Sequence, residues 1–173
     1  MIGLAGGDQV VHRVLLAEAA VFGGSGGDLL HGLTVYGGTG DDSLSHPPGL
    51  DGPPWGFLHG GRGDDALFGS GALYGGLGED RLEDSSYGAD LLVGGPGRDL
   101  VIFDEWDDYG DVVRLRGGGA DTIRCDSGFY ESDIFFVDES DHVAPACRSA
   151  RILLSGRPRD LRDPGDLGVD GGR

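Results

Sequence analysis

The sequence is poor in the residues that normally hold a globular domain together. It contains no Lys, one Met, two Cys and two Trp, and hydrophobic residues make up only 38% of its 173 positions. A chain with so little apolar bulk and a formal net charge of −17 cannot bury enough surface to offset its backbone entropy through a hydrophobic core alone. Something other than such a core must therefore contribute to its stability.

Other absences narrow the range of functions. No apolar run reaches the roughly 20 residues that a membrane-spanning helix needs, and the net charge disfavours nucleic acid and anionic membranes as partners while it favours cations. The five His form no H-E-x-x-H zinc-protease motif, and the G-x-S-x-G match at 23–27 lacks the strand–elbow–helix context of a hydrolase. We therefore expect a non-enzymatic chain without catalytic residues.

The signals for a cellular compartment are few. No export signal is recognisable, because the best candidate, Val14 to Phe22, is interrupted by Glu18 and follows no basic stretch; we interpret this segment as a strand. Cys125 and Cys147 are compatible either with one disulfide in an oxidising compartment or with two free buried thiols. These observations leave the export route open.

What the sequence has in abundance is Gly, at 36 positions, and much of it lies in a repeat. The pattern Gly-Gly-x-Gly-x-Asp-x-apolar-x occurs five times without a mismatch, against about 0.05 copies expected from shuffling, which indicates a repeat architecture. Two degraded copies flank these five, and a half-repeat precedes the fifth. The positions that we expect to bind a metal are Gly23, Gly24, Gly26 and Asp28; Gly37, Gly38, Gly40 and Asp42; Gly60, Gly61, Gly63 and Asp65; Gly75, Gly76, Gly78 and Asp80; Gly94, Gly95, Gly97 and Asp99; and, outside the perfect copies, Asp8, Asp90 and Asp121.

This nonapeptide resembles the calcium-binding repeat of repeats-in-toxin (RTX) proteins, the haemolysin-type β-roll. The resemblance covers residues 3 to about 124, and the stretch from Asp121 to Ile152 is similar to the Cys-paired endings of actinobacterial calcium-binding repeat proteins. It implies an all-β fold, a parallel β-roll or β-helix solenoid, with several calcium ions held between the loops of consecutive turns. It also implies a secreted, extracellular protein.

The residue types in the repeat suit a hard cation. Gly permits positive φ, so the first six residues of each copy can form a tight loop whose carbonyls turn inward. Calcium takes about six to eight oxygen ligands, which such carbonyls and an Asp carboxylate supply. A lone loop would provide only half a site, so we expect binding to be coupled to the stacking of turns.

The spacing of the repeat predicts where the ions lie. Successive motif Asp residues are 20, 14, 23, 15, 19 and 22 positions apart, whereas a full turn of two nonapeptides takes about 18 residues. The perfect loop therefore occurs once per turn, and we expect one row of ions along one edge, between Asp28 and Asp99. The opposite edge should hold turns of variable length, with an isolated ion at Asp90. We interpret the acid-rich run Asp104–Asp111 as a solvated loop, with an extra weak calcium site as the alternative.

Period-2 alternation predicts which side chains face the interior. Two inward columns follow, namely Val21, Val35, Leu58, Leu73 and Leu92, opposite Leu30, Leu44, Leu67, Leu82 and Val101. The residues just before each Gly-Gly pair should form an outward ladder of Phe22, Tyr36, His59, Tyr74 and Val93. This ladder either stabilises neighbouring turns by lateral stacking or offers a platform for a glycan or protein partner.

The chain divides into three parts by pattern. Residues 1–111 form the expected β-roll, residues 112–154 a degenerate last repeat and β-rich cap with the disulfide candidate, and residues 155–173 a flexible tail. The leading hypothesis is a structural module that folds on binding extracellular calcium. The alternatives are a calcium-dependent adhesin or glycan-binding surface that uses the aromatic ladder, or a fragment of a larger secreted enzyme or toxin.

Overall fold

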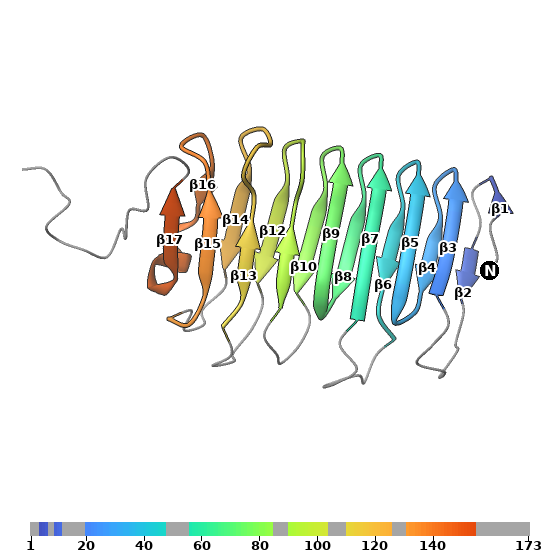
Figure 1. Ribbon diagram of the computed structural model, residues 1–173, viewed down its shortest axis with the longest axis horizontal. Helices are drawn as coiled ribbons and strands as arrows, with labels where there is room; N and C mark the ends of the chain where they lie inside the picture. Colours follow the sequence, from blue (N-terminus) through green and yellow to red (C-terminus); the bar gives the residue numbers. More distant parts are fainter. Residues whose placement is uncertain are drawn as a thin grey trace, which may run out of the picture.

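The chain folds into a parallel β-solenoid, as the repeat predicts (Figure 1). The computed structural model describes residues 4–6, 9–11, 20–47, 56–84, 90–103, 110–125 and 131–154. Asp8, the tail from 155 onward and residues 48–55 of the Pro-rich insertion lie outside these ranges. Each turn contributes one strand to each of two facing sheets, and every strand pairing within the described ranges is parallel.

The odd-numbered strands form one sheet and the even-numbered strands form the other, in chain order. The nine-stranded sheet contains β1 (Leu4–Ala5), β3 (Ala20–Ser25), β5 (Thr34–Thr39), β7 (Gly56–Arg62), β9 (Gly71–Leu77), β11 (Leu91–Val93), β13 (Val112–Arg114), β15 (Ile134–Val137) and β17 (Arg151–Leu154). The eight-stranded sheet contains β2 (Gln9–Val11), β4 (Leu29–His31), β6 (Ser43–Ser45), β8 (Ala66–Gly69), β10 (Arg81–Asp84), β12 (Leu100–Phe103), β14 (Thr122–Cys125) and β16 (His142–Val143).

A thin core lies between the two sheets. The ten inward side chains predicted from alternation are all buried, so both predicted columns are confirmed. In-register pairing carries these columns onward, through Val113 and Phe135 in one sheet and Ile123 in the other. Phe103 and Phe135 stack with ring centroids 5.5 Å apart and supply bulk that the Gly-rich turns lack.

The perfect repeats form one edge of the solenoid, the upper edge in Figure 1, where each links an odd-numbered strand to the next even-numbered strand. Their Gly residues let consecutive loops stack closely. Gly61 has a φ of +122°, and a Cβ added there would lie within 3.0 Å of the carbonyl oxygen of Gly38 in the preceding turn. An L side chain at this position is therefore opposed both by the backbone conformation and by the neighbouring loop.

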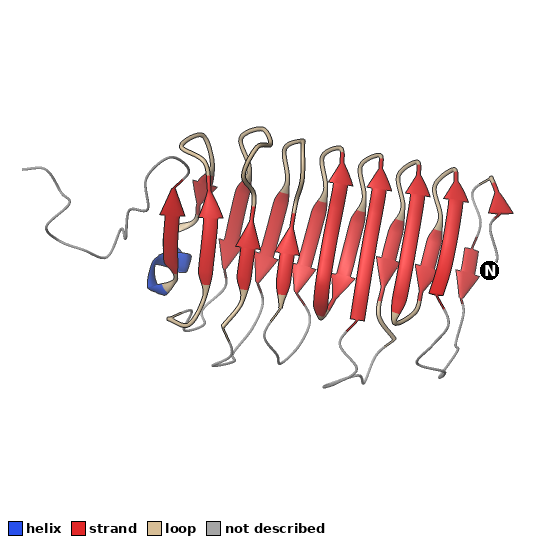
Figure 2. Ribbon diagram, viewed as in Figure 1, coloured by secondary structure: helices blue, strands red, loops and turns tan. Residues whose placement is uncertain are grey.

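The last turns continue both sheets and end in a short helix. The strand signals at Val112–Leu115 and Asp133–Val137 correspond to β13 and β15. After β16, the 3₁₀ helix η1 (Pro145–Ser149) precedes β17 and is drawn in blue in Figure 2. Cys147 in η1 is bonded to Cys125 at the end of β14, so the disulfide is present and the two Cys are not free thiols. No helix in the described ranges has the length and apolarity to cross a membrane.

Replacing Gly61 with Ala is expected to destabilise the fold by more than about 2 kcal/mol, since it combines the positive-φ penalty with a clash between turns. Gly117→Ala is the matched control. Gly117 also has a positive φ, +87°, but an added Cβ there meets nothing within 4 Å. It should lose only about 1 kcal/mol. Urea unfolding of both variants in one buffer measures the difference, and equal losses would contradict close loop stacking.

Candidate metal centre

The motif Asp residues form one continuous column along the upper edge. The backbone N–H of each donates a hydrogen bond to Oδ1 of the motif Asp in the next turn, at 2.8 to 3.0 Å. Every member except the last is buried. Stacking the turns therefore brings these carboxylates into a row inside the protein. The column consists of Asp28, Asp42, Asp65, Asp80, Asp99, Asp121 and Asp141.

The column extends further than the sequence suggested. The perfect repeats predicted a row between Asp28 and Asp99, and Asp121 was expected only from a degraded copy. The structure places Asp121 in the same row and adds Asp141, which accepts the N–H of Asp121 at 3.0 Å. The signal for Asp141 was present, because it lies two residues before the apolar Val143, as each motif Asp lies two residues before its inward side chain. The residue was not predicted because no Gly-Gly pair precedes Asp141 at the spacing of the repeat.

The second carboxylate oxygen, Oδ2, is the unusual feature of the row. In five members this atom is buried and has no hydrogen-bond partner, although the rule for buried polar atoms is that they are paired. A buried, unpaired carboxylate oxygen is costly unless a proton or a cation compensates it. The five residues are Asp42, Asp65, Asp80, Asp99 and Asp121.

In the loops of Asp42 and Asp65, the Oδ2 atom of the motif Asp lies beside the first Gly of its own loop. A carbonyl oxygen from the next turn lies beside the same Gly. A Cβ added at Gly37 would lie within 3.0 Å of both Oδ2 of Asp42 and the carbonyl oxygen of Gly60. The same holds at Gly60, where Oδ2 of Asp65 and the next turn's Gly75 carbonyl converge. The absent side chain thus leaves room in which oxygens of two consecutive turns approach each other.

Burial shifts the protonation of the row. Desolvation, opposed by the inter-turn hydrogen bond and reinforced by neighbouring carboxylates, raises the pKa of Asp65 to about 7 and that of Asp99 to about 7. The same causes raise the pKa of Asp80 and Asp121 to about 6 and shift Asp42 upward. The row therefore resists carrying full negative charge while no cation is present.

The donor atoms fit a hard cation and do not fit a soft one. All of the convergent ligand atoms are carboxylate or backbone carbonyl oxygens, which suit calcium or magnesium and not zinc or copper. Among the described residues, no group of three or more His, Cys, Asp and Glu side chains could hold a metal ion. A cation would therefore need one or two Asp carboxylates from the row together with loop carbonyls.

A second, exposed acidic row runs beside the first and was not predicted. Asp41 and Asp64 each lie one residue before a motif Asp. The N–H of Asp64 donates to Oδ1 of Asp41 at 2.9 Å, and the N–H of Glu79 donates to Oδ1 of Asp64 at 2.8 Å. This row adds negative potential at the upper edge without being buried, which makes it a natural comparison for the buried row.

On the opposite edge, the structure places Asp90 and one member of the acid-rich run in a common ladder, while the ion expected at Asp90 stays a prediction. Asp90 is not isolated but belongs to a buried ladder, because its N–H donates to Asp111 at 2.8 Å and that of Asp111 donates to Asp133 at 3.0 Å. Asp111 is therefore not part of a solvated loop; residues 104–109 of the same run lie outside the described ranges. The sequence carried a signal for this ladder in the Asp-x-apolar triplets that begin at each of its three members.

His46 occupies the same edge in earlier turns. Its ring fills the space beside Gly56 and Gly69, and Nδ1 accepts the N–H of Ser70 at 3.1 Å. Burial lowers the pKa of His46 to about 4, so the ring is neutral near pH 7. A neutral ring here stacks the turns without adding charge to the interior.

The outward aromatic ladder is present, with one unpredicted member. Phe22 and Tyr36 stack with ring centroids 5.0 Å apart and an interplanar angle of 6°. Phe57, from the neighbouring outward column, lies 5.4 Å from Tyr36 and 5.5 Å from Tyr74, and His59 also packs in this group. The rings at the stacked positions turn their faces toward one another, which favours lateral stabilisation of the turns.

The metal-free fold is expected to become more stable as the pH falls from about 8 to about 5. The folded pKa of Asp65 and Asp99, about 7, exceeds the unfolded value of about 3.9, so the folded state binds protons more tightly. This stabilisation is lost as the pH rises through the folded pKa. Thermal unfolding in chelator-treated buffer tests it, and an Asp65→Asn/Asp99→Asn variant should show a flatter profile. A melting temperature that falls on acidification would contradict the buried row.

Comparison of the chain with family models, curated proteins and solved structures found no match in any of the three. The resemblance to the RTX repeat therefore depends on the motif residues and their spacing.

Proposed function

We propose that this chain is a non-enzymatic calcium-binding module, in which several calcium ions bind between the stacked loops and thereby complete folding. One observation carries the proposal: five buried Asp carboxylates of the row each have an Oδ2 without a hydrogen-bond partner, and at Asp42 and Asp65 this atom converges with a Gly carbonyl of the next turn. Calcium supplies a positive charge to such a row and accepts about six to eight oxygen ligands with flexible geometry.

The charge of the chain supports calcium as the missing stabilising contribution. At −17 the chain repels itself when compact, and the buried row concentrates that repulsion in one column. Each bound divalent ion offsets two charges and compensates the desolvation of the carboxylates near it. Because the ligands come from two turns, the unfolded chain has no complete site, and binding free energy becomes folding free energy.

The proposed setting is extracellular. Extracellular calcium modules bind with dissociation constants of about 0.1–1 mM, which lies far above cytoplasmic calcium. At a calcium concentration about ten times the dissociation constant, one site contributes about 1.4 kcal/mol, so several sites together would decide whether the solenoid forms. The Cys125–Cys147 disulfide is of the kind that persists in oxidising compartments.

A calcium titration of the chelator-treated protein, followed by far-UV circular dichroism, is the primary experiment. We expect a cooperative gain of β structure at roughly millimolar calcium from a metal-free form that is only partly folded at neutral pH, with magnesium much less effective because it demands a smaller, octahedral shell. A spectrum that is β-rich without calcium and indifferent to its addition would overturn the proposal. In that case packing and the disulfide would hold the fold unaided.

Asp65→Asn and Asp64→Asn provide a matched pair, since each removes one carboxylate from the same loop. The Asn at 65 keeps a hydrogen-bond acceptor for the N–H of Asp42 but loses the buried charge. It should raise the melting temperature of the metal-free form and raise the calcium midpoint by roughly an order of magnitude. Asp64 is exposed, so its variant should change both quantities little. Equal effects of the two variants would place the calcium-responsive charge outside the buried row.

A further inference from the structure

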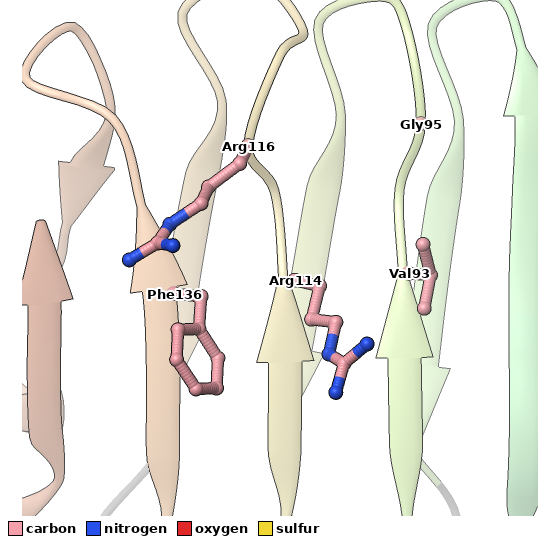
Figure 3. A pocket seen from close by; sticks show the side chains of 5 residues that line it. All are labelled: Val93, Gly95, Arg114, Arg116 and Phe136. Carbon is pink, nitrogen blue, oxygen red and sulfur yellow. The ribbon is translucent and has the colours of Figure 1, made fainter. Parts of the chain in front are cut away.

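A groove of about 400 Å³ lies on the outer face of the nine-stranded sheet, among Val93, Gly95, Arg114, Arg116 and Phe136 (Figure 3). Strand register explains its position, because Val93 pairs with Arg114 and Arg114 pairs with Phe136, all in the outward column that continues the aromatic ladder. Gly95 lies two residues after Val93, and Arg116 lies two residues after Arg114. Gly95 has no side chain, which leaves this part of the groove open.

Both Arg side chains lie beside the ring of Phe136. The guanidinium carbon of Arg116 is 5.0 Å from the ring centroid and that of Arg114 is 5.8 Å from it. In Figure 3, Arg116 reaches across to Phe136, whereas Arg114 extends toward the strand that carries Val93. Nη2 of Arg116 also donates to the carbonyl oxygens of Leu153 and Leu154, at 3.4 and 3.3 Å. These contacts hold the Arg116 guanidinium in place before any ligand arrives.

Neither of these Arg residues is in an ion pair found among the described residues. Those pairs join Arg81 to Glu83 and Arg98 to Glu79, at other places on the surface. None of the outward strand residues around the groove is acidic although the net charge is −17; Asp138, two residues after Phe136, accepts the N–H of Gly117. The outward residues of β11, β13, β15 and β17 are Leu91, Val93, Val112, Arg114, Ile134, Phe136, Arg151 and Leu153.

We propose that this groove binds a small monocarboxylate whose carboxylate is attached to an apolar body. The guanidinium of Arg114 extends toward Val93 and offers a carboxylate in the groove a fork of N–H donors. Arg116, which the Leu153 and Leu154 carbonyls hold on the β17 side of Phe136, adds positive charge to the same region. The apolar body would rest against Val93 and the exposed part of Phe136 and displace water from them. The volume falls in the range of small-molecule sites.

The charge of the whole protein favours a monoanion over a dianion such as phosphate. With a net charge of −17, the long-range potential opposes every anion, and the opposition grows with the anion's charge. The apolar lining then has to contribute to affinity, so a carboxylate without an apolar body should bind poorly. Tight binding should therefore require both the carboxylate and the apolar body of the ligand.

The groove shares two residues with the loops of the calcium proposal, because Gly95 belongs to the fifth perfect loop and Arg116 begins the degraded copy that contains Asp121. The binding test therefore uses the full chain in saturating calcium, with circular dichroism confirming that each variant is folded. A failure of carboxylate binding in a folded protein counts against the groove alone. A failure of folding to respond to calcium counts against the module.

The test compares phenylacetate, acetate and phenylacetamide in titrations followed by ¹H–¹⁵N correlation NMR. The amide resonances of the groove residues are the readout. Phenylacetate should bind at least about tenfold more tightly than either analogue. Acetate binding as tightly as phenylacetate would reduce the groove to a general anion site. Phenylacetamide binding as tightly would reduce it to an apolar surface. Either result, or no binding of phenylacetate, overturns the proposal.

Variants assign the role of Arg114. Arg114→Lys keeps the charge but loses the planar fork, so phenylacetate binding should weaken about tenfold. Arg114→Gln should weaken it similarly. Arg124→Gln is the matched control, because Arg124 is exposed on β14 in the other sheet. If Arg124→Gln weakens binding as much as Arg114→Gln, the effect is bulk charge and the site assignment is wrong.

Discussion

The hydrogen bond from the backbone N–H of one motif Asp to the carboxylate of the next is the interaction on which the solenoid depends. It repeats from Asp28 to Asp141 and ties consecutive turns together at the edge where the chain reverses. It also buries one carboxylate per turn in a thin fold with little apolar surface around it. The same contact thus stabilises the stacking of turns and also concentrates negative charge in the interior. The raised pKa values of Asp65 and Asp99 result from this burial of neighbouring carboxylates.

Much of the local sequence follows from this one contact. The first Gly of each perfect loop is small because Oδ2 of the motif Asp occupies the space where a Cβ would lie, joined at Gly37 and Gly60 by a carbonyl oxygen of the next turn. The apolar residue two positions after the Asp is turned inward by the same register. A cation that compensates the row would therefore act on the register of the whole solenoid, which is why calcium binding and folding are joined in our proposal.

The surfaces of the solenoid differ in chemistry although they are built by the same repeat. The upper edge combines the buried Asp column with the exposed Asp41–Asp64 row. The outer face of the nine-stranded sheet carries stacked aromatic rings in its early turns and the Arg114–Arg116–Phe136 groove in its later turns. Because side chains alternate along each strand, the outward residues of this face can vary while the core is kept. Inward positions meanwhile stay apolar.

The sequence by itself determined the fold class, both inward columns and the Asp row through Asp99, because these follow from a nine-residue pattern and period-2 alternation, which are local. It left open whether Cys125 and Cys147 are joined. Only the tertiary structure decided the bond between them, the ladder from Asp90 to Asp133, and the meeting of Arg116 with Phe136. The physical reason is turn length. Successive motif Asp residues are 14 to 23 positions apart, so residues brought side by side across turns have no fixed separation in sequence until the turns have stacked.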